Sequence, residues 1–233
     1  DKIGNIQYLR QSKPTIALAS PTSENYNAGT QELIRWTVSA ANTGNIGWEK
    51  IVFDVSGSVI ITSGGASYTI GSSPDSEQTD GIYMSTTTIS GGAVGVQLIA
   101  ASSMEIWDVD SNTQVTGTST PFLVDQATAT GTARVSFVAS AEQQVSANTT
   151  KTYKLLGTIQ QGSGQIGTSM LTKIASRSTT ATSTVYADVA ATTGTFVWTD
   201  RSGAGDVHSA GSLDWTHDFK VSGLSTPTKT LTR

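Results

Sequence analysis

The chain has 233 residues, a formal net charge of −4 and no cysteine, and charged residues make up 14% of it. This length can form one large β domain or two small ones, with a core that needs no disulfide or structural metal. The Lys and Arg residues are few and scattered, so no positive field would gather nucleic acid, and no apolar run is long enough to cross a bilayer as a helix.

The first 30 residues differ from the rest of the chain. Pro14 and Pro21 enclose a short run in which Ile16 and Leu18 alternate with small residues, and a cluster of turn residues follows it. Proline at the border of a strand marks an edge, because it cannot donate to a β-ladder. We therefore expect residues 1–30 to be an extended N-terminal arm that could act as a donor strand. The start at Asp1 suggests an exported protein after removal of its signal, with a trimmed chain as the alternative.

The body of the chain is a series of short β-branched runs separated by Gly, Ser, Asn and Thr, and no stretch favours a long helix. The spacing of about 8 to 12 residues between turn signals is typical of a β-sandwich or barrel. We predict an all-β, Ig-like or Greek-key β-sandwich with long loops, formed as one elaborated domain by residues 31–233. The clearest expected strands are Leu33–Val38, Trp48–Val55, Met104–Val109, Gln114–Thr118, Ala133–Val138, Lys151–Ile159, Met170–Ala175, Val185–Val189, Thr195–Thr199, Phe219–Val221 and Thr228–Arg233.

Three segments carry a family resemblance. They are NIQYLRQSKPTIAL at residues 5–18 with ELIRW at 32–36, SANTTKTYKL at 146–155, and the C-terminal FVWTD, HS, DWT and GLSTPTKTLT at 196–232. In these segments the chain resembles exported surface proteins of small-genome, candidate-phylum bacteria, and the resemblance spans most of its length. It implies a secreted or cell-surface location. It implies no activity and carries over no catalytic or binding residue.

One short pattern suggests calcium. Asp108, Asp110 and Asn112 have the spacing of the first three ligands of a calcium loop, in which every second residue supplies an oxygen ligand. Thr113 stands where the loop requires Gly, and Ser119 stands where it requires a bidentate Glu. The alternative is a polar hairpin tip. We expect no other cofactor.

Three of the five tryptophans, Trp48, Trp107 and Trp215, adjoin polar loops and are candidates for stacking on sugars. Core packing is the alternative for each. No serine lies in a G-x-S-x-G turn, and no pattern brings two acids or a His and a nucleophile together. We therefore expect no enzyme, and a secreted hydrolase is the least favoured hypothesis.

These features favour an extracellular structural subunit that assembles with copies of itself into a pilus-like filament or a surface lattice. Strand addition from the arm would join the copies, because an exposed sheet edge recruits a further strand. The expected subunit contacts are the apolar residues of the arm, Ile3, Ile6, Tyr8, Leu9, Ile16 and Leu18. Two alternatives remain open. The arm is an ordinary first strand of its own domain, or the protein is a monomeric adhesin or carbohydrate-binding module that recognises cell-surface glycans.

Overall fold

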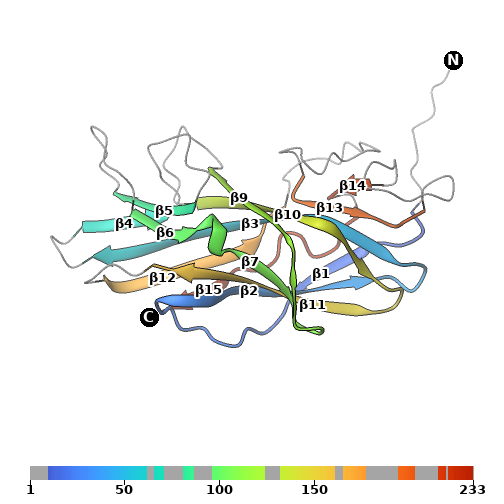
Figure 1. The fold of residues 1–233 in the computed structure, drawn as a ribbon, viewed down its shortest axis with the longest axis horizontal. Helices are drawn as coiled ribbons and strands as arrows, with labels where there is room; N and C mark the ends of the chain where they lie inside the picture. The colour runs from blue at the N-terminus through green and yellow to red at the C-terminus, as the bar shows by residue number, and fades with distance from the viewer. Residues whose placement is uncertain are drawn as a thin grey trace, which may run out of the picture.

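A computed structural model describes residues 10–61, 66–70, 81–86, 96–123, 132–160, 165–176, 194–202, 215–218 and 220–232. Across these residues the protein is all-β, and the only helical segment among them is a 3₁₀ turn at Ala101–Ser103. Two antiparallel sheets pack against each other as a sandwich (Figure 1). The prediction of an all-β sandwich is therefore confirmed.

The first sheet is built from the N-terminal strands and a strand near the middle of the chain. Its pairing order is β1 (Pro14–Leu18), β2 (Gly29–Ala40), β11 (Thr150–Ile159), β7 (Glu105–Asp108) and β8 (Thr113–Val115). Alternate residues of β2 and β11 are buried, as expected for strands with one face on the core. The antiparallel register aligns Trp36 of β2 with Tyr153 of β11 and Leu18 of β1.

The second sheet is organised around β3 (Ile46–Ile61), which has partners along both edges. One edge of β3 pairs with β10 (Thr132–Val145), and β10 pairs in turn with β9 (Gly117–Leu123). The other edge pairs first with β13 (Phe196–Thr199) and then with β12 (Gln165–Ile174). The outer strands are β14 (Trp215–His217) beside β13 and β15 (Lys229–Thr232) beside β12.

Three further strands connect the two sheets at one end of the sandwich. They are β4 (Ala66–Ile70), β5 (Gly81–Thr86) and β6 (Val96–Ala100). Each pairs with the next, β4 pairs with the end of β3, and Ile99 of β6 pairs with Ile159 of β11. Hydrogen bonds therefore run continuously from the second sheet to the first at this end.

The centre of the core is a chain of aromatic rings that crosses the sandwich. Trp36 lies 5.2 Å from Phe53 and 5.8 Å from Tyr153, while Trp48 lies 5.2 Å from Tyr153 and 6.1 Å from Phe196, measured between ring centroids. All five side chains are fully buried. Trp36 and Tyr153 come from the first sheet and the other three from the second, so the contacts hold the sheets face to face.

The chain changes sheet between β8 and β9, and a glycine makes this possible. A Cβ atom on Gly117 would collide with the backbone oxygen of Val138 and lie 2.5 Å from the ring of Phe137. Both neighbours belong to β10, and the Phe137 ring is itself buried in the core. Only a residue without a side chain fits at this position.

We predict that Gly117→Ala lowers the free energy of unfolding by about 1–3 kcal/mol, since overpacking forces backbone or core shifts. Urea unfolding followed by tryptophan fluorescence measures the change. The matched control is Gly44→Ala, where the new Cβ would meet only the flexible side chain of Gln11, at 3.1 Å. Equal effects of the two substitutions would contradict this account of the crossing.

Candidate functional site

The described chain begins at a buried ionic contact, here called the arm root. Arg10 Nη1 donates to Asp200 Oδ1 at 3.2 Å, and the backbone N–H of Gln11 donates to Asp200 Oδ2 at 2.6 Å. The hydroxyl of Ser202 also donates to Asp200 Oδ1, at 2.7 Å. The Asp200 side chain is fully buried and that of Arg10 is 7% exposed, with its guanidinium 5.7 Å from the centroid of the Trp198 ring.

The local sequence explains why Asp200 is available for this contact. It follows directly after β13, and the next residue, Arg201, has a φ of 58° that turns the chain. The backbone N–H of Arg201 donates to the hydroxyl of Thr199 at 2.9 Å. The turn leaves the Asp200 carboxylate facing Arg10 and Gln11. A buried carboxylate with a guanidinium and N–H donors around it fixes the chain direction at Arg10.

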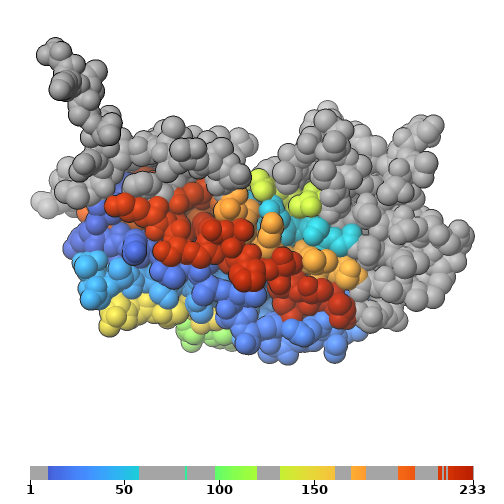
Figure 2. Space-filling model, turned by 180° about the vertical axis from the view of Figure 1, so that it is seen from behind, coloured from blue at the N-terminus to red at the C-terminus, as the bar shows by residue number. Residues whose placement is uncertain are grey.

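From the arm root the chain enters β1, and the two edges of β1 have different partners. One edge pairs with β2 over the whole length of β1. Along the other edge the N–H of Ile16 donates to the oxygen of Ser222 at 2.8 Å, and the N–H of Ser222 donates to the oxygen of Pro14 at 3.2 Å. The tail, residues 220–232, therefore runs beside β1 and parallel to it. Figure 2 shows the tail as a band along the N-terminal segment.

Two of the predicted subunit contacts, Ile16 and Leu18, lie in this part of the structure. Ile16 is 2% exposed and belongs to the core of its own sandwich, because the pairing of β1 with β2 turns its side chain inward. Leu18 is partly buried and packs against the same core. The Ile16 side chain is therefore not an exposed anchor, whereas Leu18 is exposed in part. Of the expected arm over residues 1–30, residues 10–30 lie on the sandwich, and Ile3, Ile6, Tyr8 and Leu9 lie outside the described residues.

The line along which β1 and residues 19–28 face the tail is called here the seam. It is closed near β1 by the bonds to Ser222, and closed again farther along. There the N–H of Tyr26 donates to the oxygen of Thr232 at 2.8 Å, and the N–H of Thr232 donates to the oxygen of Glu24 at 2.9 Å. Tyr26 is fully buried, which raises the pKa of its hydroxyl to about 12 and keeps it neutral.

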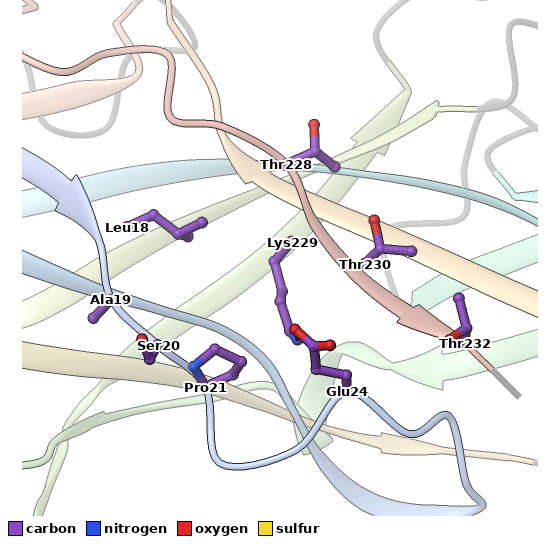
Figure 3. Close-up of a pocket in the computed structure, with 9 residues that line it drawn as sticks. All are labelled: Leu18, Ala19, Ser20, Pro21, Glu24, Thr228, Lys229, Thr230 and Thr232. Atoms are coloured by element: carbon purple, nitrogen blue, oxygen red, sulfur yellow. Dashed lines mark hydrogen bonds and ion pairs between the residues drawn. The ribbon is translucent and has the colours of Figure 1, made fainter.

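Between these two closures the seam opens into a groove of about 470 Å³, called here the terminal groove (Figure 3). One wall comes from the segment after β1 and the other from the tail. The groove is lined by Leu18, Ala19, Ser20, Pro21, Glu24, Thr228, Lys229, Thr230 and Thr232.

An ion pair crosses the terminal groove. Lys229 Nζ lies 3.2 Å from Glu24 Oε1, and Figure 3 shows the two side chains meeting head to head. The Lys229 side chain is 4% exposed, whereas that of Glu24 is 77% exposed. Thr228 and Thr230 extend to the opposite side of the strand from Lys229, as alternation requires. The groove thus has a buried cation in its wall and an exposed carboxylate on its rim.

The arm root and the terminal groove lie toward opposite ends of the molecule. The arm root is fixed at the end of β13, which lies with β14 toward one end of the long axis, and β15 lies toward the other end (Figure 1). The parallel course of β1 and the tail agrees with this arrangement, because both run from the arm root toward the terminal groove. The two features therefore have head-to-tail geometry.

The predicted calcium residues form a hairpin tip. Asp108 Oδ1 accepts from the N–H groups of Asp110 and Ser111 at 3.0 and 3.1 Å, and its Oδ2 lies 3.1 Å from Lys151 Nζ. Asp110 Oδ2 accepts from the N–H of Thr152 at 2.8 Å. The Asp108 and Asp110 carboxylates are thus committed to backbone and lysine donors, and Asn112, with φ of 52°, supplies the turn. Within the described residues no group of three or more His, Cys, Asp or Glu is placed to hold a metal ion.

The three predicted sugar-binding tryptophans are not in one exposed row. Trp48 and Trp215 are fully buried, so neither can present an indole face to a glycan in this structure. Trp107 is half-buried, its indole N–H donates to Glu105 Oε2 at 2.9 Å, and Lys154 Nζ lies 5.9 Å from its ring centroid. Polar flanking residues predicted exposure for all three, but the packing of Trp48 against Tyr153 shows that local polarity does not report burial.

Sequence reasoning missed the two ion pairs that define the ends of the seam. Arg10 and Asp200 are 190 positions apart, and Lys229 and Glu24 are 205 positions apart. No spacing rule connects residues so distant in the chain. One local feature indicated the arm root. Asp200 directly follows an apolar strand, so its carboxylate lies beside the core, where it needs a partner.

No family model, no curated protein and no solved structure matches the chain. No helix in the described ranges is long and apolar enough to span a membrane.

We predict that Asp200→Asn lowers the free energy of unfolding by about 3–5 kcal/mol, because it removes the buried negative charge that pairs with the Arg10 guanidinium. Chemical denaturation at neutral pH measures the change in the free energy of unfolding. The matched control is Lys173→Gln, whose amine is 41% exposed and 4.0 Å from Asp54, and which should change stability by less than about 1 kcal/mol. Similar losses of stability from both substitutions would contradict a stabilising buried ion pair at the arm root.

We predict that Asp108 in the hairpin tip makes the protein less stable to unfolding as the pH falls into the acid range. Burial alone would raise the pKa of Asp108, but hydrogen bonds from Ser111, Lys151 and Asp110 outweigh it and hold the pKa below its ordinary value of 3.8. A lowered folded pKa stabilises the protein above the unfolded pKa, and that stability is lost as the pH falls through the folded value. Urea unfolding between about pH 5 and about pH 2 should show a smaller loss of stability for Asp108→Asn than for the wild type. A destabilisation by Asp108→Asn that is the same at every pH would contradict this role.

Proposed function

We propose that this protein is an extracellular structural subunit that assembles head to tail with copies of itself into a pilus-like filament or a surface lattice. The N-terminal residues before Arg10 act as the strand that one copy adds to the next. The observation that carries the proposal is the arm root, where Asp200 fixes the chain direction at one end of the molecule, away from the terminal groove. Contacts between different patches at opposite ends produce an open chain of subunits wherever the rotation between copies does not close a ring.

The architecture supports this role in two further ways. Successive strands change sheet at residues 41–45, 116 and 146–149, which is the behaviour expected of the Ig-like Greek-key sandwich that we propose for the finer topology. The Ser and Thr content gives a surface that is wetted without strong charge, so copies can approach without large repulsion. The exported, cell-surface location proposed from the sequence fits such an assembly.

Hydroxyl groups line the outer face of the first sheet. Ser39 Oγ lies 2.7 Å from Thr150 Oγ1, and Thr30 Oγ1 lies 3.1 Å from Thr158 Oγ1, each pair joining β2 to β11. These side chains satisfy one another across the strands. These two pairs are polar and uncharged, which suits the solvent-facing side of a filament better than an apolar contact between copies.

We predict that deleting residues 1–9 abolishes the polymer and leaves a folded monomer, because the deletion removes the donor segment and keeps Arg10. Electron microscopy and light scattering measure assembly, and thermal unfolding checks the fold. The matched control replaces residues 1–9 by nine Gly and Ser residues, which preserves length without the apolar side chains, and it should also remain monomeric. A truncated chain that still forms the polymer of the full chain would overturn the proposed function.

A further inference from the structure

The terminal groove is a gap between the edges of the two sheets. On one side β1 belongs to the first sheet, and on the other β15 belongs to the second. Among the described strands β15 pairs only with β12. On its opposite edge Thr232 is bonded to residues 24 and 26, and the residues of β15 before Thr232 border the groove. The seam is closed by hydrogen bonds at Ser222 and at Thr232, and the terminal groove lies between these points.

The lining of the groove is suited to an extended peptide. Leu18 and the ring of Pro21 give apolar surface, and Thr228 and Thr230 of the tail complete the lining. The rim carries the Glu24 carboxylate, which is largely exposed although it pairs with Lys229. A sheet edge beside a groove with apolar and polar walls is the arrangement in which a peptide adds as a strand, through main-chain bonds and alternate side chains.

We infer that the terminal groove is the acceptor site for residues 1–9 of a second copy of this chain. This inference rests on the proposed function and names the surface that receives the arm.

Three observations favour this occupant. Nine extended residues reach about 30 Å, enough to leave the arm root and cover a groove on a neighbour. Ile6 and Tyr8 stand at period two, so one face of an added strand would be apolar and would contact Leu18. The arm also carries Lys2, whose charge is opposite to that of Glu24 on the rim.

The direction of the chain separates a neighbour's arm from the protein's own arm. β1 runs from the arm root toward the terminal groove, so the same chain would have to reverse at Arg10 to place residues 1–9 in its own groove. The bonds from Asp200 to both Arg10 and Gln11 oppose that reversal. A second copy placed end to end needs no reversal.

The absence of cysteine from the chain permits a direct test by disulfide cross-linking. Thr230→Cys is combined in turn with Gly4→Cys, Ile6→Cys and Tyr8→Cys, so that both faces and several registers of an added strand are sampled. A disulfide forms only where the two Cα atoms come within about 7 Å. After oxidation of assembled material, denaturing gels without reductant should show a ladder of covalent dimers and higher multimers for at least one pair, and reductant should abolish it.

The matched control combines the same arm cysteines with Thr113→Cys, an exposed residue on β8 of the first sheet, and it should give no ladder. Filaments that form normally without a ladder from any Thr230 pair would overturn the acceptor site while leaving the proposed function intact. Cross-links confined to single chains would also overturn it, because the arm would then fill its own groove. If the unmodified chain forms no polymer, the proposed function fails and the inference fails with it.

Discussion

The backbone edge of a sheet needs a partner, and in this protein both chain ends are used to satisfy that need at the same seam. β1 enters from the arm root and the tail runs parallel to it, so the first and last segments of the chain meet along one line. Their hydrogen bonds join the first sheet to the second at Ser222 and at Thr232. The open stretch between those points is the terminal groove, and its position follows from how the two ends are tied down.

The aromatic core and the seam have different roles. Trp36, Phe53, Tyr153, Trp48 and Phe196 contact one another across the sheets at the centre of the sandwich. Large buried rings contribute most of the apolar area of such a core, so the sandwich keeps its sheets together without help from the seam. The seam is held by a few main-chain bonds and two ion pairs. A region held in that way opens or exchanges partners more readily than the core.

Much of the fold could be predicted from the sequence, because alternation within a strand depends only on near neighbours. The strands expected at Leu33–Val38, Trp48–Val55, Ala133–Val138 and Lys151–Ile159 are confirmed within β2, β3, β10 and β11. The strand expected at Phe219–Val221 is not formed at its described residues, since Lys220 has a φ of 58° and turns the chain. The site depends instead on partners at opposite ends of the sequence, which no local pattern connects. At the Asp108 hairpin a local pattern is present but fits two structures. Acidic residues at the spacing of a calcium loop are equally suited to accepting hydrogen bonds from the backbone of a tight turn.

The ion pairs at the two ends of the seam differ in burial, and the difference matters for assembly. At the arm root both side chains are buried, so the contact is rigid and breaking it is costly. At the terminal groove Lys229 is buried but Glu24 is largely exposed, so the carboxylate stays paired with the lysine and still presents its exposed side to the solvent. In the proposed assembly, the rigid arm root would keep a copy's own arm from swinging back, and the exposed side of Glu24 would receive the lysine of a neighbour's arm. The proposed filament would then grow in one direction.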